Sequence, residues 1–596
     1  MKKIYLYTVM GVAFLTGAAS CSDDYFDIDY YDIIQPKILL TSQAYIEQGL
    51  MSVYDELYNN NLTPNVVFAN CPMLDMRPTG WDYQFGNWSW LTDHNYVASS
   101  WNTPFNAVAR ANTFLVNLRD ADVNIFDDGE NTRKIIEAQA RAIRAYYYSQ
   151  LVKNFGGVPL LEEGDTYTGA PDKPRNTAEE VWQLVINDLE YCKGILGWDP
   201  WKGQRGRTTL GMVKYYLAQA YMYTNRFADA KKELKDIIES GRYALNPCYG
   251  QIHLEGQYWQ SESIWEVCYP VFEDMTWGVF SKTDAVWMPA QQFGAVEYGG
   301  WGPQMTSYEF VWSFEQGDKR LDYEVAQYGH IHPFINNYVG LTKGWRSAYV
   351  GIDNLPSNFV MKVWKEIPGL GGKECVGMPA TVARLAGAYL DYAECCFQLE
   401  GENSTEGWEY IQKVRDRAWG ALEPSSTYNK PFPIALNTDP TVKAPDAKAF
   451  YSTYKRTAGK ISGPYKRLVG GNDETPIYED GPIYTSTYSY TPYTSPAWKV
   501  ALLSERRHEF YCEYSLWYDA IRMGIVKEYL DAEYPKNNEN IIFQEIPGYG
   551  TTDFFVPNPH TKRTFDYDKK WELYPIPIDE INRNKAIVQN PGYGGN

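Results

Sequence analysis

Cysteines at the Cys-x-x-Cys spacing are missing from this sequence, and its one close pair is the adjacent Cys395-Cys396. None of its nine cysteines forms a Cys-x-x-Cys motif, and the eight that follow Cys21 are scattered between Cys71 and Cys512. Structural zinc sites and dithiol redox motifs need cysteines at such close spacing, so neither is indicated. The pair His330-x-His332 has no third ligand residue nearby, and we predict no metal ion and no cofactor.

An excess of basic residues is also missing. The chain has 74 acidic and 55 basic residues, which gives a net charge of −19 at pH 7. Nucleic acid is a poor partner for such a chain, because its phosphates are negative too. The sequence contains no Ser/His/Asp motif, and the glycine-rich stretch at 369–374 lacks the hydroxyl residue and spacing of a phosphate-binding loop.

Apolar runs are limited to one short stretch near the N-terminus. Lys2 and Lys3 give a basic start, residues 6–15 are mostly apolar, and small residues follow at 17–20. This is the layout of a secretory signal peptide. A membrane-spanning helix needs about 20 predominantly apolar residues, and no later stretch approaches about 18. We therefore expect a folded body outside the bilayer, with residues 1–20 removed.

Cys21 stands where this signal peptide would be cleaved. The preceding Ala-Ala-Ser at 18–20 resembles a loose bacterial lipobox, and lipoproteins of this kind carry acyl chains on the cysteine sulfur. Each buried methylene contributes about 0.8 kcal/mol, so a multiply acylated Cys21 would hold the chain at a membrane. Asp23 and Asp24 resemble the signal that exports some Bacteroidetes lipoproteins to the outer face. An ordinary signal peptide followed by a free cysteine is the alternative.

Helical signals dominate the first half of the body. Thr177 and Glu180 form a capping box, which precedes an apolar helical pattern and predicts a helix that ends at about Lys193. Residues 133–160, RKIIEAQARAIRAYYYSQLVKNFGGVPL, predict a long helix that ends at Gly156.

Residues 210–245 carry the most diagnostic helical pattern. Two apolar helical faces are separated by Asn225, and Ala218 and Ala230 are small enough to let the two helices approach. This pattern resembles a tetratricopeptide repeat. A second candidate pair of helices spans 382–419, where a generic helical hairpin fits equally well. Such repeats usually form a scaffold, so they do not locate a binding site by themselves.

Aromatic residues are unusually abundant, with 20 Trp, 50 Tyr and 24 Phe. Between and after the helical units, residues 246–380 and 420–498 are rich in Gly, Pro, Trp and Tyr and show no helical period. Long irregular segments in a compact body are usually functional or disordered, and high aromatic content argues against disorder. We therefore expect ordered loops that face a ligand.

Two stretches in the C-terminal third carry specific motifs. Residues 504–524, SERRHEFYCEYSLWYDAIRMG, contain Arg-Arg-x-Glu-Phe followed by Trp-Tyr-Asp, and residues 573–593, LYPIPIDEINRNKAIVQNPGY, contain Pro-Ile-Pro and a final Gln-Asn-Pro-Gly-Tyr. They resemble the two signatures of the SusD/RagB family of Bacteroidetes outer-membrane lipoproteins, although Leu516 stands where that family usually has a basic residue. Residues 99–115 and 144–160 also resemble the family, in the right order along the chain.

This resemblance implies a mainly α fold with one domain at 21–596, in which tetratricopeptide-like helices support an irregular, loop-rich ligand-binding subdomain. The helical parts are then expected at about 43–60, 100–245, 381–419 and 499–524, and the loop-rich parts at about 61–99, 246–380 and 420–498. The resemblance also implies a surface-exposed protein, lipid-anchored in the outer membrane. Such a protein captures oligosaccharide or polysaccharide and delivers it to a TonB-dependent transporter of the SusC type.

Carbohydrate recognition needs particular side chains. Sugar rings present flat faces of C–H groups beside rims of hydroxyls, so a binder needs exposed aromatic planes with polar partners at their edges. Two aromatic clusters fit this need, one in GWDYQFGNWSW at 80–90 and one between 277 and 301. The candidate ligand-binding residues are Trp81, Tyr83, Asn87, Trp88 and Trp90 in the first cluster, and Trp277, Trp287, Tyr298 and Trp301 in the second. Packing is the alternative role for each of them.

Two other functions stay open at this level. A glycoside hydrolase would need only two carboxylates. Glu505 and Glu509 are four residues apart beside Arg506 and Arg507, and we expect them to form salt bridges on a helix face instead. A peptide- or protein-binding surface lipoprotein is the third possibility. We predict a binding protein without catalytic residues.

Overall fold

The computed structural model describes most of the helical body of this chain. The described residues are 40–58, 62–78, 83–163, 165, 172–252, 258–268, 304–326, 331–332, 337–338, 358–360, 379–420, 443–456, 460–461, 466–471, 476–480, 484–486, 490–534, 541–543, 554–556, 563 and 565–594.

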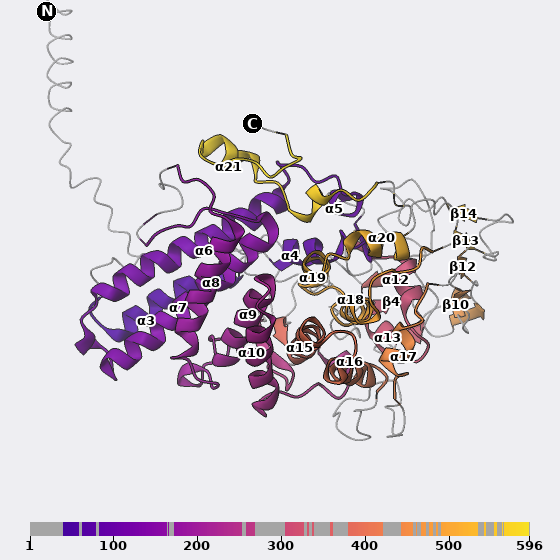
Figure 1. The fold of residues 1–596 in the computed structure, drawn as a ribbon, viewed down its shortest axis with the longest axis horizontal. Helices are drawn as coiled ribbons and strands as arrows, with labels where there is room; N and C mark the ends of the chain where they lie inside the picture. Colours follow the sequence, from indigo (N-terminus) through magenta and orange to yellow (C-terminus); the bar gives the residue numbers. More distant parts are fainter. Residues whose placement is uncertain are drawn as a thin grey trace, which may run out of the picture.

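The described body is mainly helical, as predicted, and it is elongated (Figure 1). The α-helices are α3 Gln43–Asp55, α4 Leu62–Asn70, α5 Tyr83–Asn87, α6 Asn95–Asp120, α7 Gly129–Phe155, α8 Ala178–Lys193, α9 Leu210–Tyr223, α10 Phe227–Glu239, α12 Tyr308–Ser313, α13 Arg320–Glu324, α15 Leu385–Glu400, α16 Thr405–Ala418, α17 Ala447–Tyr451, α18 Ala497–Glu509, α19 Leu516–Arg522, α20 Val526–Glu533 and α21 Ile578–Arg583.

Local chemistry sets several helix ends where the sequence predicts them. The hydroxyl of Thr177 accepts a hydrogen bond from the backbone N–H of Glu180, whose carboxylate accepts one from the N–H of Thr177 in return, so the capping box begins α8. Gly156 ends α7 with a φ of 72°, a backbone conformation that glycine adopts at little cost. Asn225, with a φ of 58°, separates α9 from α10.

Successive helices pack against one another from α6 to α10, and α10 then packs against α15 and α15 against α16. In Figure 1 these helices run from one end of the molecule to its centre, where α18 and α19 follow. Both helix pairs predicted at 210–245 and 382–419 are present. The helical part is therefore a stack of antiparallel pairs, in which each pair buries its apolar face against the next.

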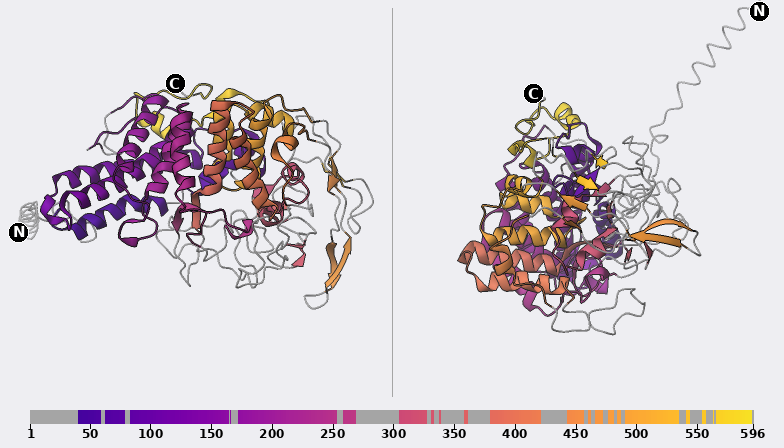
Figure 2. Two further views of the ribbon diagram at one scale, coloured as in Figure 1. Left: turned by 60° about the horizontal axis from the view of Figure 1, so that its bottom comes forward. Right: turned by 90° about the vertical axis from the view of Figure 1, so that its right-hand side faces the viewer.

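The strands are short and lie beside the C-terminal helices. They are β1 Met76–Pro78, β2 Ser263–Cys268, β3 Gln304–Thr306, β4 Val325–Ala326, β5 Ile331–His332, β6 Asn337–Tyr338, β7 Asn358–Val360, β8 Pro379–Arg384, β9 Lys460–Ile461, β10 Lys466–Gly471, β11 Pro476–Asp480, β12 Tyr484–Ser486, β13 Ile541–Phe543 and β14 Phe554–Val556. Two four-stranded sheets have the orders β1-β3-β7-β4 and β14-β13-β12-β9, and β2 pairs with β8. The β10–β11 hairpin projects from the body in Figure 2.

The segment expected to be loop-rich at 61–99 is partly helical, because it contains α4, α5 and the beginning of α6. Its sequence shows little helical period because α4 is buried on several sides. Val66, Val67 and Phe68 are consecutive in α4 and all are 0% exposed. Among the described residues, no helix combines the length and the apolar character needed to cross a membrane.

The C-terminal segment returns to the N-terminal helices. The backbone N–H of Tyr574 donates to the carbonyl of Asn154 at 2.8 Å, and the N–H of Ile578 donates to the carbonyl of Thr92 at 2.9 Å. The side-chain amide of Asn590 donates to the carbonyl of Phe155 at 3.1 Å. The second signature, 573–593, therefore closes the C-terminal end of α7 and covers the loop before α6, as the yellow segment in Figure 1 shows.

Candidate functional site

The two segments with the predicted ligand aromatics are attached to paired strands. β1 and β3 are antiparallel, with Pro78 opposite Gln304. Trp81 follows Pro78 by three residues, and Trp301 precedes Gln304 by three residues. Three residues span at most about 11 Å, and opposed residues in antiparallel strands lie about 5 Å apart. Both tryptophans are thus attached by short stretches of chain to neighbouring points at one end of this sheet.

A buried carboxylate holds the base of β1. Asp75, the residue before β1, is 0% exposed, and its Oδ1 accepts hydrogen bonds from Arg507 Nη2 and Tyr534 OH at 2.6 Å each and from Tyr529 OH at 2.9 Å. The hydroxyls of Tyr534 and Ser307, which follows β3, are 2.8 Å apart. Burial raises the pKa of Asp75, and the Arg507 guanidinium offsets part of the rise. Side chains of the C-terminal third therefore fix both strands.

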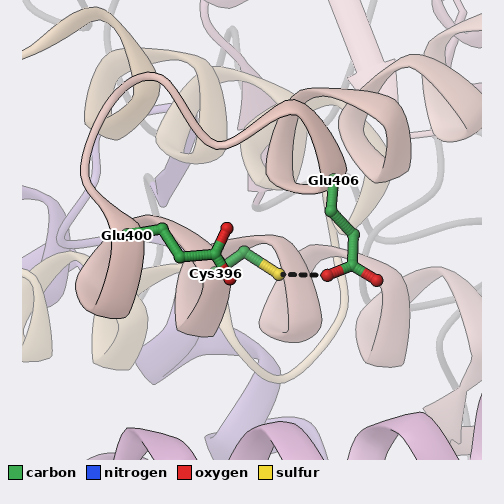
Figure 3. Close-up of side chains that lie close together, drawn as sticks. All are labelled: Cys396, Glu400 and Glu406. Carbon is green, nitrogen blue, oxygen red and sulfur yellow. Dashed lines mark hydrogen bonds between the residues drawn. The ribbon is translucent and has the colours of Figure 1, made fainter.

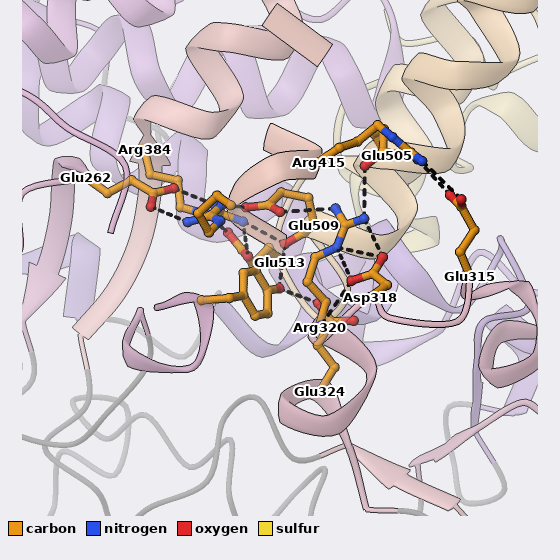
Figure 4. A network of polar contacts seen from close by, with 12 residues as sticks. Glu262, Glu315, Asp318, Arg320, Glu324, Arg384, Arg415, Glu505, Glu509 and Glu513 are labelled. Carbon is orange, nitrogen blue, oxygen red and sulfur yellow. Dashed lines mark hydrogen bonds and ion pairs between the residues drawn. The ribbon is translucent and has the colours of Figure 1, made fainter. Parts of the chain in front are cut away.

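A second buried cluster holds the β2–β8 pair (Figure 4). Arg384, the last residue of β8, donates to Glu509 Oε1 at 2.6 Å, to Glu262 Oε1 at 2.7 Å and to Glu513 Oε1 at 2.9 Å. Glu262 comes directly before β2, and residues 269–303 follow β2 along the chain. The first signature thus anchors the β2–β8 pair, and the segment with the second aromatic cluster follows β2 along the chain.

The expected salt bridges of Glu505 and Glu509 on a helix face are wrong. Both carboxylates are 0% exposed, and their partners come from other elements. Glu505 pairs with Arg320 at 2.9 Å and with Arg415 at 2.6 Å, whereas Glu509 pairs with Arg320 at 3.3 Å and with Arg417. The i, i+4 spacing is typical of exposed pairs, but here this face of α18 is covered by α13, α16 and β8.

The charge state of Glu509 follows from its neighbours. Burial alone raises its pKa, but the guanidinium groups of Arg417, Arg384 and Arg320 outweigh burial and bring the pKa to about 2. A glycosidase needs one carboxyl group that protonates the glycosidic oxygen and a second that faces the sugar. Glu505 and Glu509 are buried and occupied by guanidinium groups, so this pair is not arranged for that chemistry.

Arg506 and Leu516 in the first signature are also internal. Arg506 Nη2 lies 2.5 Å from Asp391 Oδ1 and its Nη1 lies 3.1 Å from Asp519 Oδ2. Leu516 is 0% exposed and packs in the main hydrophobic core, which explains why an apolar residue is accepted at this position. The Arg-Arg-x-Glu part of the signature therefore holds elements together through buried ion pairs.

Two of the predicted ligand aromatics are core residues. Trp88 is 2% exposed, its Nε1 donates to the carbonyl of Pro72 at 2.9 Å, and its ring stacks on Phe565 with centroids 4.8 Å apart. Trp90 is 1% exposed, and its Nε1 donates to the hydroxyl of Tyr593 at 2.8 Å. The expectation that these rings are exposed is wrong, because C-terminal residues cover them.

Tyr83 and Asn87 are exposed on α5. Tyr83 has 48% of its surface accessible and is the first residue of the helix, two positions after Trp81. An exposed phenol ring beside an exposed amide provides both a stacking plane and hydrogen-bonding groups for a sugar. These two residues remain predicted ligand contacts.

The other sequence-predicted site residues lie outside the described residues. They are Cys21, Trp81, Trp277, Trp287, Tyr298 and Trp301. Conversely, sequence reasoning missed the buried ionic residues that hold the strands. These are Asp75, Glu262, Arg320, Arg384, Arg415 and Arg417, and apart from the Asp318–Arg320 pair their partners lie so far away along the chain that no local spacing could have indicated them.

One group of side chains has the composition of a metal site (Figure 3). The ligand atoms of Cys396, Glu400 and Glu406 lie within 4.8 Å of one another. Lys231 Nζ, however, lies 2.7 Å from Glu400 Oε1 and 2.9 Å from Glu406 Oε2. Burial raises the pKa of the Cys396 thiol to about 11, so it is protonated at neutral pH. The ammonium of Lys231 takes the place that a cation would need.

Comparison with family models matches nearly the whole chain. The model described as "SusD family" matches residues 261–444 and 473–593, and the model described as "Starch-binding associating with outer membrane" matches residues 24–252. A "SusD-like protein" of Bacteroides ovatus is 22% identical over 439 residues, which cover 67% of this chain and 74% of that protein. "SusD-like protein P25" of Formosa agariphila is 21% identical over 459 residues, 70% of this chain and 82% of that protein.

Solved structures show the same fold. A SusD-like carbohydrate binding protein from Bacteroides fragilis superposes with a TM-score of 0.64 at 17% identity, over 92% of this chain and 100% of that one. Surface glycan-binding protein A from Bacteroides uniformis gives a TM-score of 0.60 at 20% identity, over 92% of this chain and 99% of that one. From its two family-model matches and these relatives, the chain belongs to the SusD family.

Proposed function

We propose that this protein is a cell-surface glycan-binding lipoprotein that captures oligosaccharide and passes it to a SusC-like TonB-dependent transporter of the outer membrane. Membership in the SusD family supports glycan binding, and several relatives of the same fold are named for it, among them a laminarin-binding SusD-like protein. The family description, starch-binding associating with outer membrane, supports the location.

The observation that carries this proposal is the pairing of β1 with β3. Trp81 follows β1 by three residues and Trp301 precedes β3 by three residues. Their short connections to paired strands support one bound oligosaccharide that contacts both aromatic segments. Tyr83, exposed on α5, adds a ring two residues after Trp81 in the sequence. The buried ion pairs of Arg507 and Arg384 give both segments a rigid base.

The affinity for a soluble oligosaccharide should be modest. A cargo that must be passed on cannot be held too tightly, so we expect a Kd between about 1 μM and 1 mM, equivalent to about −8 to −4 kcal/mol. Stacking on aromatic planes supplies most of this energy, because sugar hydroxyls exchange water hydrogen bonds for protein hydrogen bonds with little net gain.

Affinity electrophoresis on a panel of polysaccharides tests the binding function, with a reducing-sugar assay run beside it. The mature protein should be retarded by at least one glycan and should release no reducing sugar. The double variant Trp81→Ala, Trp301→Ala should lose the retardation. Tyr45→Ala is the matched control, because Tyr45 is 39% exposed on α3, away from the β1–β3 sheet.

Several outcomes would refute the proposal. Release of reducing sugar by the pure protein would show a glycoside hydrolase. Unchanged retardation of the Trp81→Ala, Trp301→Ala variant would show that the ligand binds elsewhere. Absence of retardation on every glycan, together with capture of peptides, would favour the peptide-binding alternative.

The membrane anchor and the transporter are tested separately. Metabolic labelling with an alkyne fatty acid should mark the wild-type protein and leave Cys21→Ala unlabelled. Proteinase treatment of intact cells should digest the anchored protein if it faces outward. Mild detergent extraction through a C-terminal tag should recover a TonB-dependent transporter, and recovery of the protein alone would contradict the partnership.

A further inference from the structure

A cavity of about 60 Å³ is lined by residues of α7, α9, β8, α18 and α19. Both Arg384 and Arg506 reach its wall, so the first signature contributes to it as well. The lining residues include Asn65, Tyr146, Gln150, Lys153, Tyr215, Val382, Ala383, Phe510, Glu513, Ser515 and Asp519.

Six polar side chains in this wall make no hydrogen bond with any other group in the part of the chain that the structure describes. The polar atoms of Asn65, Tyr146, Gln150, Lys153 and Tyr215 are accessible from the cavity, so a ligand or water there would supply their partners. The Oγ of Ser515 is buried and unpartnered. The six residues are Asn65, Tyr146, Gln150, Lys153, Tyr215 and Ser515.

Lys153 gives the cavity its charge. Its ammonium makes no ion pair within 4.0 Å in the described chain, and its nearest described partner is the ring of Tyr223, 5.3 Å from Nζ to the centroid. The carboxylates in the wall are already engaged, since Asp519 pairs with Arg506 and Glu513 pairs with Arg384. A negative group beside Lys153 would therefore meet free donors and no uncompensated carboxylate.

One part of the wall is apolar. Val382, Ala383 and the ring of Phe510 line the cavity together with the tyrosine rings. The wall therefore combines an ammonium group and several hydroxyl and amide groups with an aliphatic side. This combination fits a small molecule with a charged head and a short carbon tail. A sugar ring does not fit, because even benzene needs a cavity of about 150 Å³.

We propose that this cavity binds a short-chain carboxylate of one to three carbon atoms, such as acetate. The carboxylate accepts hydrogen bonds from Lys153 and from the hydroxyl of Tyr215, and the methyl group lies against Phe510 and Val382. This site is independent of the proposed glycan site, and either can exist without the other.

The proton on Lys153 sets the pH range of binding. Burial lowers its pKa to about 8, Asp519 and Asp391 oppose this shift, and Arg522 adds to it. The other charged groups around the cavity are Arg506 on α18, Arg384 on β8 and Glu513. The ammonium that the carboxylate needs is present at pH 7 and largely lost at pH 9.5, so binding should weaken at least tenfold between these values.

Thermal unfolding of the mature full-length protein tests the proposal, with sodium acetate as the probe and sodium chloride at equal ionic strength as the reference. A ligand that binds only the folded state raises Tm with its concentration, and we expect a rise of about 1–3 °C at 50 mM acetate and pH 7. Acetamide has the same shape without the charge and should give no rise. With four non-hydrogen atoms, acetate cannot bind tighter than about 0.04 mM.

Two variants locate the effect. Lys153→Met should abolish the acetate-dependent rise, whereas Lys134→Met, at an exposed position on the same helix, should keep it. Tyr215→Phe serves where Lys153→Met does not fold, and it should reduce the rise at least by half. An equal rise with acetamide or chloride, an unchanged rise in the two cavity variants, or no rise at all would overturn the proposal and leave a cavity that holds water only.

Discussion

Replacement of Glu509 by glutamine is the sharpest test of the buried ionic cluster. Glu509 is 0% exposed, and its two oxygens accept hydrogen bonds from Arg384 at 2.6 Å, from Arg320 at 3.3 Å and from Arg417. Glutamine has nearly the same shape, so the packing around α18 is kept. Its amide nitrogen carries hydrogens, however, and one of the two acceptor positions becomes a donor that faces a guanidinium.

The magnitude follows from burial. Removing one partner of a buried ion pair costs about 3–5 kcal/mol, because the remaining charge stays buried without compensation. Here three arginines lose a shared carboxylate, although each keeps another one. Arg384 still pairs with Glu262, and Arg320 still pairs with Asp318. We therefore expect Glu509→Gln to lower the free energy of unfolding by about 3 kcal/mol, at the lower end of that range.

Urea unfolding followed by tryptophan fluorescence measures this loss as a shift of the midpoint at constant slope. Glu409→Gln is the matched control, because Glu409 pairs with Lys413 at 2.9 Å on the surface of α16, with 59% of the glutamate side chain exposed. Exposed pairs on a helix contribute about 0.3–0.5 kcal/mol. A loss below about 1 kcal/mol for Glu509→Gln, or one equal to the control, would refute the view that this cluster supports the fold.

Three further outcomes are expected. Trp88→Ala should lower the free energy of unfolding by about 3–5 kcal/mol, because it empties a core site, and the folded fraction should keep its retardation in affinity electrophoresis. Gly157→Ala should cost about 1–3 kcal/mol or more in urea unfolding, since a Cβ there would lie 2.1 Å from the carbonyl oxygen of Asn176; Gly197→Ala, with its nearest atom at 3.9 Å, should be nearly neutral. The pKa of Glu509 is lowered in the folded protein to about 2, against an ordinary value of 4.5. The resulting stability is fully present above pH 4.5 and is lost as the pH falls through 2. Between these two pH values the free energy of unfolding should therefore fall by about 3 kcal/mol through this group. Constant stability over that range would contradict the assigned ion pairs.

Features determined by nearby residues could be predicted from the sequence. The capping box of Thr177 and Glu180, the helix ends at Gly156 and Lys193, and the break at Asn225 depend on residues within a few positions of one another. The helical period needs only a window of about 11–18 residues to be recognised. The mainly helical fold was therefore accessible without the structure.

Features that depend on distant residues could not be predicted in the same way. Trp90 lies in a glycine-punctuated stretch typical of an exposed loop, yet its burial depends on Tyr593, 503 residues further along the chain. Arg507 and Asp75 are 432 residues apart. Ion pairs between distant elements follow no fixed spacing in the sequence, because their residues meet only after the helices have packed. The same holds for β1 and β3, whose three-residue strands carry no alternating pattern.

The return of the C-terminal segment to α7 has a consequence for biogenesis. A polypeptide that is made N-terminus first has α6 and α7 complete long before Tyr574 and Asn590 follow. Until the C-terminal segment is present, the indole of Trp90 and the terminal carbonyls of α7 stay uncovered. Nonsense mutations late in the gene should therefore leave an unfinished, protease-sensitive chain instead of a slightly shortened one.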